Sequence, residues 1–77
     1  MPSSPLTAEA ALHLREISDA MAALPQRQRT ALLLSYLGYS GQEIADAMGI
    51  TRVGVFPQVL KGRHRLKETL RDRGVLP

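Results

Sequence analysis

The chain has 77 residues and a formal net charge of +3, which is room for one domain with one modest core. It contains no cysteine, which excludes disulfides and thiolate metal sites, and neither His13 nor His64 is expected to hold a metal. No apolar run approaches the length of a membrane span, and no secretory signal is recognisable. We therefore expect a cytoplasmic protein with no metal, no cofactor and no membrane partner.

The charge is unevenly distributed along the chain. Residues 1–51 hold three basic and five acidic side chains, a balance of −2, whereas residues 52–77 hold seven basic and two acidic ones, a balance of +5. A basic C-terminal third on a nearly neutral body is typical of a surface that binds a polyanion. A solvated helix face that is basic for solubility would give the same balance.

The first half of the chain predicts two helices. Residues 1–6 are expected to form a flexible lead-in to a domain over residues 7–73, with residues 74–77 as a C-terminal tail. Thr7 is the expected N-cap of the first helix. Its buried stripe is predicted to be Ala10, Leu14, Ile17, Met21 and Leu24.

Pro25 ends the first helix and is expected to open the second, because proline suits the first helical position. The second helix is predicted to run from about residue 26 to about residue 36. Gly38 then ends that helix as a left-handed C-cap. Much of the core is predicted to come from Ala31, Leu32, Leu33, Leu34 and Leu37.

Two further helices follow. Ser40 and Glu43 have the spacing of a capping box, which predicts a short third helix that ends at Gly49. Its inward residues are predicted to be Ile44, Ala45 and Met48. Thr51 is expected to cap a fourth helix that runs to about residue 70, with an inward stripe of Val55, Val59, Leu66 and Leu70.

The third and fourth helices together predict a helix-turn-helix. The pattern is a short capped helix, a glycine turn and a longer basic helix, and Gly49 is free to adopt the positive φ that a sharp turn requires. Such a motif presents the N-terminal half of its second helix to the DNA major groove. An ordinary helical hairpin in a small bundle is the alternative. The predicted fold class is all-α, a small four-helix domain.

Specific motifs connect this pattern to a known family. They are Leu24-Pro25 with Gln28-Arg29, then Tyr39-Ser40 before Glu43-Ile44-Ala45, then Met48-Gly49-Ile50-Thr51. With them, the segment from Ala23 to about Leu70 resembles region four of the sigma-70 family of RNA polymerase initiation factors, particularly the extracytoplasmic-function type. LuxR-type regulator domains share the middle of the pattern. The Leu24-Pro25 motif, which follows an amphipathic helix, favours the resemblance to sigma region four over the resemblance to LuxR-type domains.

The resemblance implies a function and partners. Such domains bind the −35 element of promoter DNA, dock on the flap of the RNA polymerase beta subunit, and are often masked by an anti-sigma protein. The DNA-binding residues that it implies here all lie at the start of the fourth helix or along it: Thr51, Arg52, Gly54, Phe56, Gln58, Lys61, Arg63 and Arg65. Because the resemblance is confined to region four, we expect either an excised domain or a stand-alone partial protein.

The expected recognition helix departs from the family's pattern at positions 54 and 56–58. The family carries a hydroxyl residue where this chain has Gly54, and polar or basic residues where it has Phe56, Pro57 and Gln58. A proline inside a helix costs about 3 kcal/mol and is expected to kink or break it.

Two interpretations remain open. In the first, Pro57 only bends the helix, Arg52 and Gln58 reach the bases, and Phe56 packs on a thymine methyl. In the second, an exposed apolar patch of Val53, Phe56 and Leu60 binds protein, and the chain is a degenerate sigma-like module, of co-sigma or anti-sigma type, that reads little DNA sequence.

Catalysis is not predicted. The sequence offers no nucleophile with a nearby base and no glycine-rich phosphate loop, and Glu43 and Asp46 lie on a helix too short to form a pocket. We therefore expect a binding domain and not an enzyme.

Overall fold

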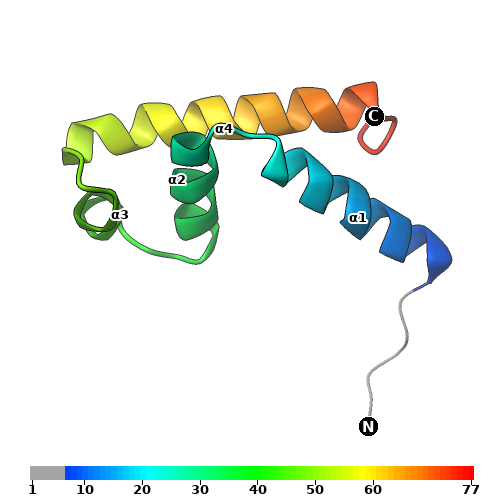
Figure 1. Ribbon diagram of the computed structural model, residues 1–77, viewed down its shortest axis with the longest axis horizontal. Coiled ribbons are helices and arrows are strands. Elements are labelled where there is room, and N and C mark those ends of the chain that lie inside the picture. The colour runs from blue at the N-terminus through cyan, green and yellow to red at the C-terminus, as the bar shows by residue number, and fades with distance from the viewer. Residues whose placement is uncertain (1–6) are drawn as a thin grey trace, which may run out of the picture.

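The computed structural model describes residues 7–77; the predicted lead-in, residues 1–6, lies outside the described residues. Four helices follow in order: α1 (Ala8–Ala22), α2 (Gln26–Tyr36), α3 (Gly41–Met48) and α4 (Arg52–Asp72). The long α4 runs along one edge, with α3 and α2 beside its first half and α1 beneath its second half (Figure 1). Residues 7–77 contain no strand, so the predicted all-α fold with four helices is confirmed.

Local hydrogen bonds explain where α1, α2 and α3 begin or end. The Thr7 hydroxyl accepts the N–H of Ala10 at 3.0 Å, as the N-cap prediction requires. At α3 the predicted capping box is present, because Ser40 Oγ accepts from the Glu43 N–H at 3.1 Å and Glu43 Oε1 accepts from the Ser40 N–H at 2.9 Å. Gly38 closes α2 with a φ of +92°, which confirms the predicted left-handed residue.

The predicted starts of α2 and α4 are confirmed, but the capping of each differs in detail from the prediction. Pro25 occupies the N-cap position of α2, one residue before the predicted one, with an extended ψ of 142° and a carbonyl that accepts from Arg29. Thr51 occupies the N-cap position of α4, but its hydroxyl makes no capping hydrogen bond. The N–H of Gly54, which a capping hydroxyl would take, donates instead to the Thr51 carbonyl at 2.9 Å.

The core lies where α2 and α3 pack on α4. Ala31 and Leu32 of α2 are fully buried, and Ile44 and Ala45 of α3 are nearly so. Met48 and Ile50 pack against this cluster. The inward stripe predicted for α4 is confirmed, since all four of its residues are buried: Val55, Val59, Leu66 and Leu70.

The burial predicted for α1 is confirmed only in part. Leu24 is buried, Met21 packs against the core and Ala10 is half-buried, but Leu14 and Ile17 are 57% and 38% exposed. The reason is the placement of α1, whose first half projects away from the other helices (Figure 1). On α2 the predicted Leu33 and Leu37 are also exposed, because only a narrower stripe of that helix faces α3 and α4.

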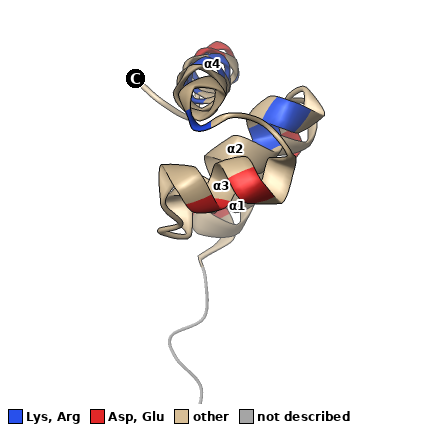
Figure 2. Cartoon of the chain, turned by 90° about the vertical axis from the view of Figure 1, so that its left-hand side faces the viewer, with Lys and Arg blue, Asp and Glu red and all other residues tan. Residues whose placement is uncertain are grey.

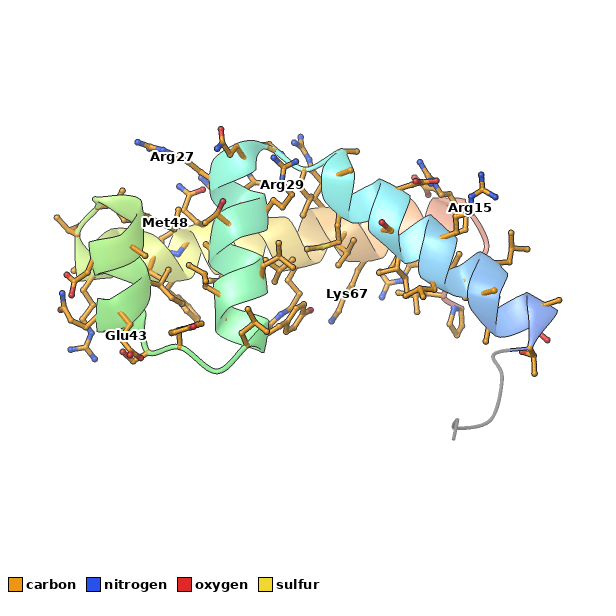
Figure 3. The ribbon with its side chains drawn as sticks, turned by 60° about the horizontal axis from the view of Figure 1, so that its bottom comes forward. Arg15, Arg27, Arg29, Glu43, Met48 and Lys67 are labelled. Atoms are coloured by element: carbon orange, nitrogen blue, oxygen red, sulfur yellow. The ribbon has the colours of Figure 1, made fainter. Side chains whose placement is uncertain are left out.

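A close helix crossing joins α2 to α4 at Gly62. This glycine is buried, and a Cβ atom placed on it would lie only 3.1 Å from the backbone oxygen of Gln28. The neighbouring Arg29 donates from Nη1 to the carbonyls of Ala22 at 2.9 Å and Leu24 at 3.3 Å, across the junction of α1 and α2 (Figure 3). Gln28 and Arg29 therefore belong to the contacts that hold the helices together.

The helix α4 continues through Pro57 without a break. The predicted break is therefore absent, although the ring leaves the Val53 carbonyl without its helical donor. At the far end Gly74 adopts a φ of +77°, and the N–H of Val75 donates to the Leu70 carbonyl at 2.8 Å. Val75 and Leu76 consequently fold back onto the core.

Candidate nucleic-acid interface

The turn between α3 and α4 sets the first half of α4 at the edge of the molecule. Gly49 has a φ of +67°, which confirms the predicted left-handed turn residue. The N–H of Ile50 donates to the Ala45 carbonyl at 3.1 Å, and the Ile50 side chain packs against the core. These contacts fix the direction in which α4 leaves the turn, so α3 and α4 form the predicted helix-turn-helix.

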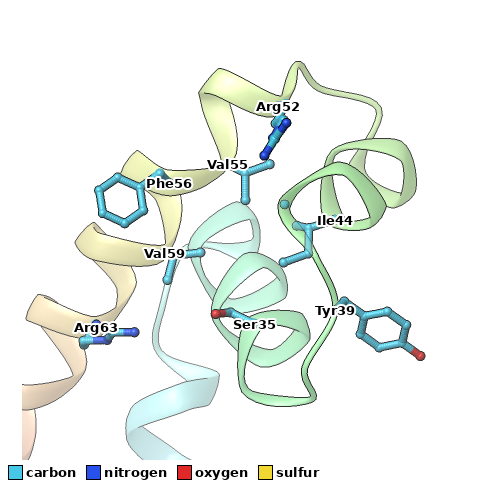
Figure 4. A pocket seen from close by; sticks show the side chains of 9 residues that line it. Ser35, Tyr39, Ile44, Arg52, Val55, Phe56, Val59 and Arg63 are labelled. Atoms are coloured by element: carbon cyan, nitrogen blue, oxygen red, sulfur yellow. The ribbon is translucent and has the colours of Figure 1, made fainter.

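One flank of α4 borders a hollow of about 290 Å³ between α4, α3 and the end of α2. Arg52, Phe56 and Arg63, three of the predicted DNA-binding residues, lie along its edge. In Figure 4, Val55 and Val59 point into the hollow while the Phe56 ring points away from it. This flank therefore combines an apolar floor with two guanidinium groups.

The opposite flank carries the other predicted residues of α4. Each residue turns an α-helix by about 100°, so Gln58, two residues after Phe56, lies on nearly the opposite side. Lys61 follows Gln58 by three residues and Arg65 follows Lys61 by four, so both share the side of Gln58. Gly54 is half-buried beside the turn, where a Cβ atom would lie 3.5 Å from Thr51 Oγ1. The eight predicted residues therefore do not form one face.

Between the two flanks runs an apolar ridge, which we define as Val53, Phe56, Pro57 and Leu60. All four are exposed, with Val53 at 84% and Phe56 at 65%. Their spacings of three and four place them on one side of the helix. Only Phe56 was among the predicted DNA-binding residues. Val53 and Leu60 were predicted to form an exposed apolar patch with Phe56, and their exposure is confirmed. Pro57 was detectable too, since it lies four residues from Val53 and three from Leu60.

The flanks are basic and largely free of ion pairs. Within residues 7–77 the contacts of this kind join His64 Nε2 to Glu68 Oε1 at 2.9 Å and Arg73 Nη1 to Glu16 Oε2 at 3.4 Å. Neither involves the predicted basic residues of the interface, Arg52, Lys61, Arg63 and Arg65. Acidic residues mark α3 (Figure 2), whereas α4 carries six basic residues against two acidic ones. The charge asymmetry of the sequence thus becomes a basic surface along α4.

Other kinds of site are not apparent in the described part of the chain. Residues 7–77 contain no group of three or more His, Cys, Asp or Glu side chains that could hold a metal ion. None of the four helices combines the length and apolar character needed to cross a membrane.

Comparison with models of known protein families places the helix-turn-helix in a family. Residues 14–66 match the family model described as "Sigma-70, region 4". The chain belongs to the sigma-70 region 4 family. A comparison with curated proteins found no match. The match spans most of α1, all of α2 and α3, and the part of α4 that carries the ridge and both flanks. The domain is thus a DNA-binding helix-turn-helix of transcription initiation.

Proposed function

We propose that this region-four domain binds the −35 element of bacterial promoters through the first half of α4, as part of a cytoplasmic initiation factor of the extracytoplasmic-function type. One observation carries the proposal: basic residues with no ion-pair partner within residues 7–77 straddle an exposed helix face, with Arg52 and Arg63 on one flank and Lys61 and Arg65 on the other. A helix with its side chains is about 10–12 Å across and fits a major groove about 12 Å wide. Basic residues on both flanks can then reach the phosphates of both strands.

The two flanks also suggest different roles for their residues. Arg52 stands in the first turn of α4, where recognition helices contact base edges, whereas Gln58 lies on nearly the opposite side of the helix from Phe56. Lys61, Arg63 and Arg65 lie further along the helix, where phosphate contacts position a protein without reading sequence.

Alanine variants test these roles by fluorescence anisotropy on labelled duplexes at several salt concentrations. Lys61→Ala and Arg63→Ala should weaken binding to every sequence alike and reduce the salt slope by about 1. Arg52→Ala should relax base preference by about 1–3 kcal/mol at one position. Gln58→Ala should leave base preference nearly unchanged, because Gln58 points away from the face that carries Phe56.

Arg15→Ala is the matched control. Arg15 is exposed on α1, at the opposite end of the molecule from α3 (Figure 3). Its loss changes net charge by the same amount as the loss of Arg63 and should leave the affinity nearly unchanged. If Arg15→Ala weakens binding as much as Arg63→Ala, the DNA does not lie on α4.

We further propose that the exposed apolar residues of α1 contact the flap of the RNA polymerase beta subunit. Leu12 and Leu14 are 58% and 57% exposed and lie away from the ridge of α4. Leu14→Glu should weaken binding to the purified flap while leaving DNA affinity unchanged. Equal binding of the flap by wild type and variant would exclude this surface.

A second candidate function follows from the ridge itself. Val53, Phe56 and Leu60 are exposed apolar side chains on the face that would meet DNA, which favours a protein-binding module of co-sigma type, or contact with an anti-sigma protein. This alternative predicts no DNA binding even at low salt, together with retention of a partner protein that Phe56→Ala abolishes.

A further inference from the structure

The ridge of α4 offers DNA no hydrogen-bonding side chain. Val53, Phe56, Pro57 and Leu60 carry only apolar atoms, and Pro57 has no backbone N–H. Hydrogen bonds to base edges can come only from the flanks, from Arg52 on one side and from Lys61 on the other. The ridge must therefore contact an apolar group of the DNA. Otherwise it would bury donors and acceptors of the bases without hydrogen bonds, which costs binding free energy.

Unmodified DNA presents one apolar group in the major groove. This group is the C5-methyl of thymine; guanine, adenine and cytosine show only donors and acceptors there. The ridge from Val53 to Leu60 spans seven helical steps, or about 10 Å, which corresponds to about three base-pair steps. A short run of thymine methyls therefore matches the ridge in both chemistry and length.

The charge around the ridge favours DNA over an apolar protein as its occupant. Arg52 and Arg63 border it on one flank and Lys61 and Arg65 on the other, and none of them has an ion-pair partner within residues 7–77. A duplex supplies phosphates on both sides of the groove and methyl groups at its centre, in the same arrangement.

We infer that the ridge reads thymine by its methyl group, so that the domain recognises an A·T-containing segment through apolar contact. This inference rests on the proposed function, since it specifies the DNA that the same face of α4 selects. Phe56 and Val53, which are 65% and 84% exposed, are the specificity-determining residues.

Replacement of thymine by deoxyuridine tests the inference, because it removes the methyl group and leaves base pairing intact. The motif selected by the protein from a random duplex pool is synthesised with thymine and with deoxyuridine, and both duplexes are titrated by anisotropy. Each contacted methyl should be worth about fourfold in affinity, so two methyls under the ridge give about a sixteenfold loss. Phe56→Ala should bind the two duplexes with nearly equal affinity.

Tyr36→Ala is the matched control variant. Tyr36 is an aromatic residue 59% exposed, close to the 65% of Phe56, but it lies at the end of α2, so its truncation should leave the full deoxyuridine effect in place. Because Phe56 is exposed, its truncation should not unfold the domain, and circular dichroism checks that it has not.

The outcomes separate the inference from the function on which it rests. A selected motif that binds equally well with deoxyuridine, or that contains no thymine at the ridge, overturns methyl recognition and leaves DNA binding in place. Salt-dependent binding without any motif does the same. The absence of DNA binding at low salt overturns both and makes a protein the occupant of the ridge.

Discussion

Two glycines of α4 should respond in opposite directions to the same substitution. Both stand in helical positions, where alanine is intrinsically favoured by up to about 1 kcal/mol. At Gly54 an added Cβ atom would lie 3.5 Å from Thr51 Oγ1 and 3.8 Å from Ile50 Cδ1, which are ordinary contacts. Gly54→Ala should therefore stabilise the domain, by somewhat less than the full amount because the residue is in the first turn.

At Gly62 the steric cost should exceed that gain. An added Cβ atom would lie 3.1 Å from the backbone oxygen of Gln28 and 3.4 Å from its Cβ, so α2 must move. Movement of α2 disturbs Ala31 and Leu32, which are fully buried, and overpacking of this kind costs about 1–3 kcal/mol. We expect Gly62→Ala to lose about 1 kcal/mol net, which lowers the melting temperature of a domain of this size by about 4–8 °C.

Thermal unfolding followed by circular dichroism at 222 nm measures both variants against wild type. The predicted order of melting temperatures is Gly54→Ala above wild type and Gly62→Ala below it. If Gly62→Ala were as stabilising as Gly54→Ala, α2 would yield without cost and the crossing would not be tightly packed.

Three further predictions concern the helix ends and the proline. Pro57→Ser should raise the free energy of unfolding, measured by urea denaturation, by up to about 3 kcal/mol because it restores a helical donor. A lower free energy of unfolding in the variant would mean that the fold depends on the proline. Ser40→Ala should cost about 1 kcal/mol in thermal unfolding, whereas Thr51→Ala, whose hydroxyl makes no capping bond, should be nearly neutral; equal losses would contradict the observed caps. Arg29→Ala should speed amide hydrogen exchange at the end of α1 and cost about 1 kcal/mol, and an equal effect of Arg27→Ala would argue against its two hydrogen bonds.

The elements that could be predicted from sequence are those defined by local chemistry. Ser40 with Glu43 makes a cap from residues three apart, and Gly38 and Gly49 take conformations that other residues rarely adopt. The inward stripe of α4 followed from spacing alone, because that helix has a partner along most of its length.

Features that depend on distant parts of the chain could not be predicted. The apolar stripe of α1 shows that the helix has two faces, but not that α4 covers only its end, so Leu14 and Ile17 remain exposed. In sequence, Gly62 only weakens a helix; its role appears when Gln28 lies against it. The cap at Thr51 has the expected residue and backbone but not the expected hydrogen bond.

The candidate site was predicted to the correct helix but not to a single face. Phe56 and Gln58 are close in sequence and point to nearly opposite sides of α4. The helical spacing of Val53, Phe56 and Leu60 was sufficient to find the ridge. That this ridge is the centre of the exposed surface became clear only with the packing of α2 and α3.

The most direct test of DNA recognition by α4 is selection from a randomised duplex pool across a salt series, followed by sequencing of the bound fraction. We predict a steep loss of affinity with salt together with an enriched motif that contains thymine. A steep salt dependence with no motif would contradict base recognition by this domain. No binding at the lowest salt concentration would contradict DNA binding itself.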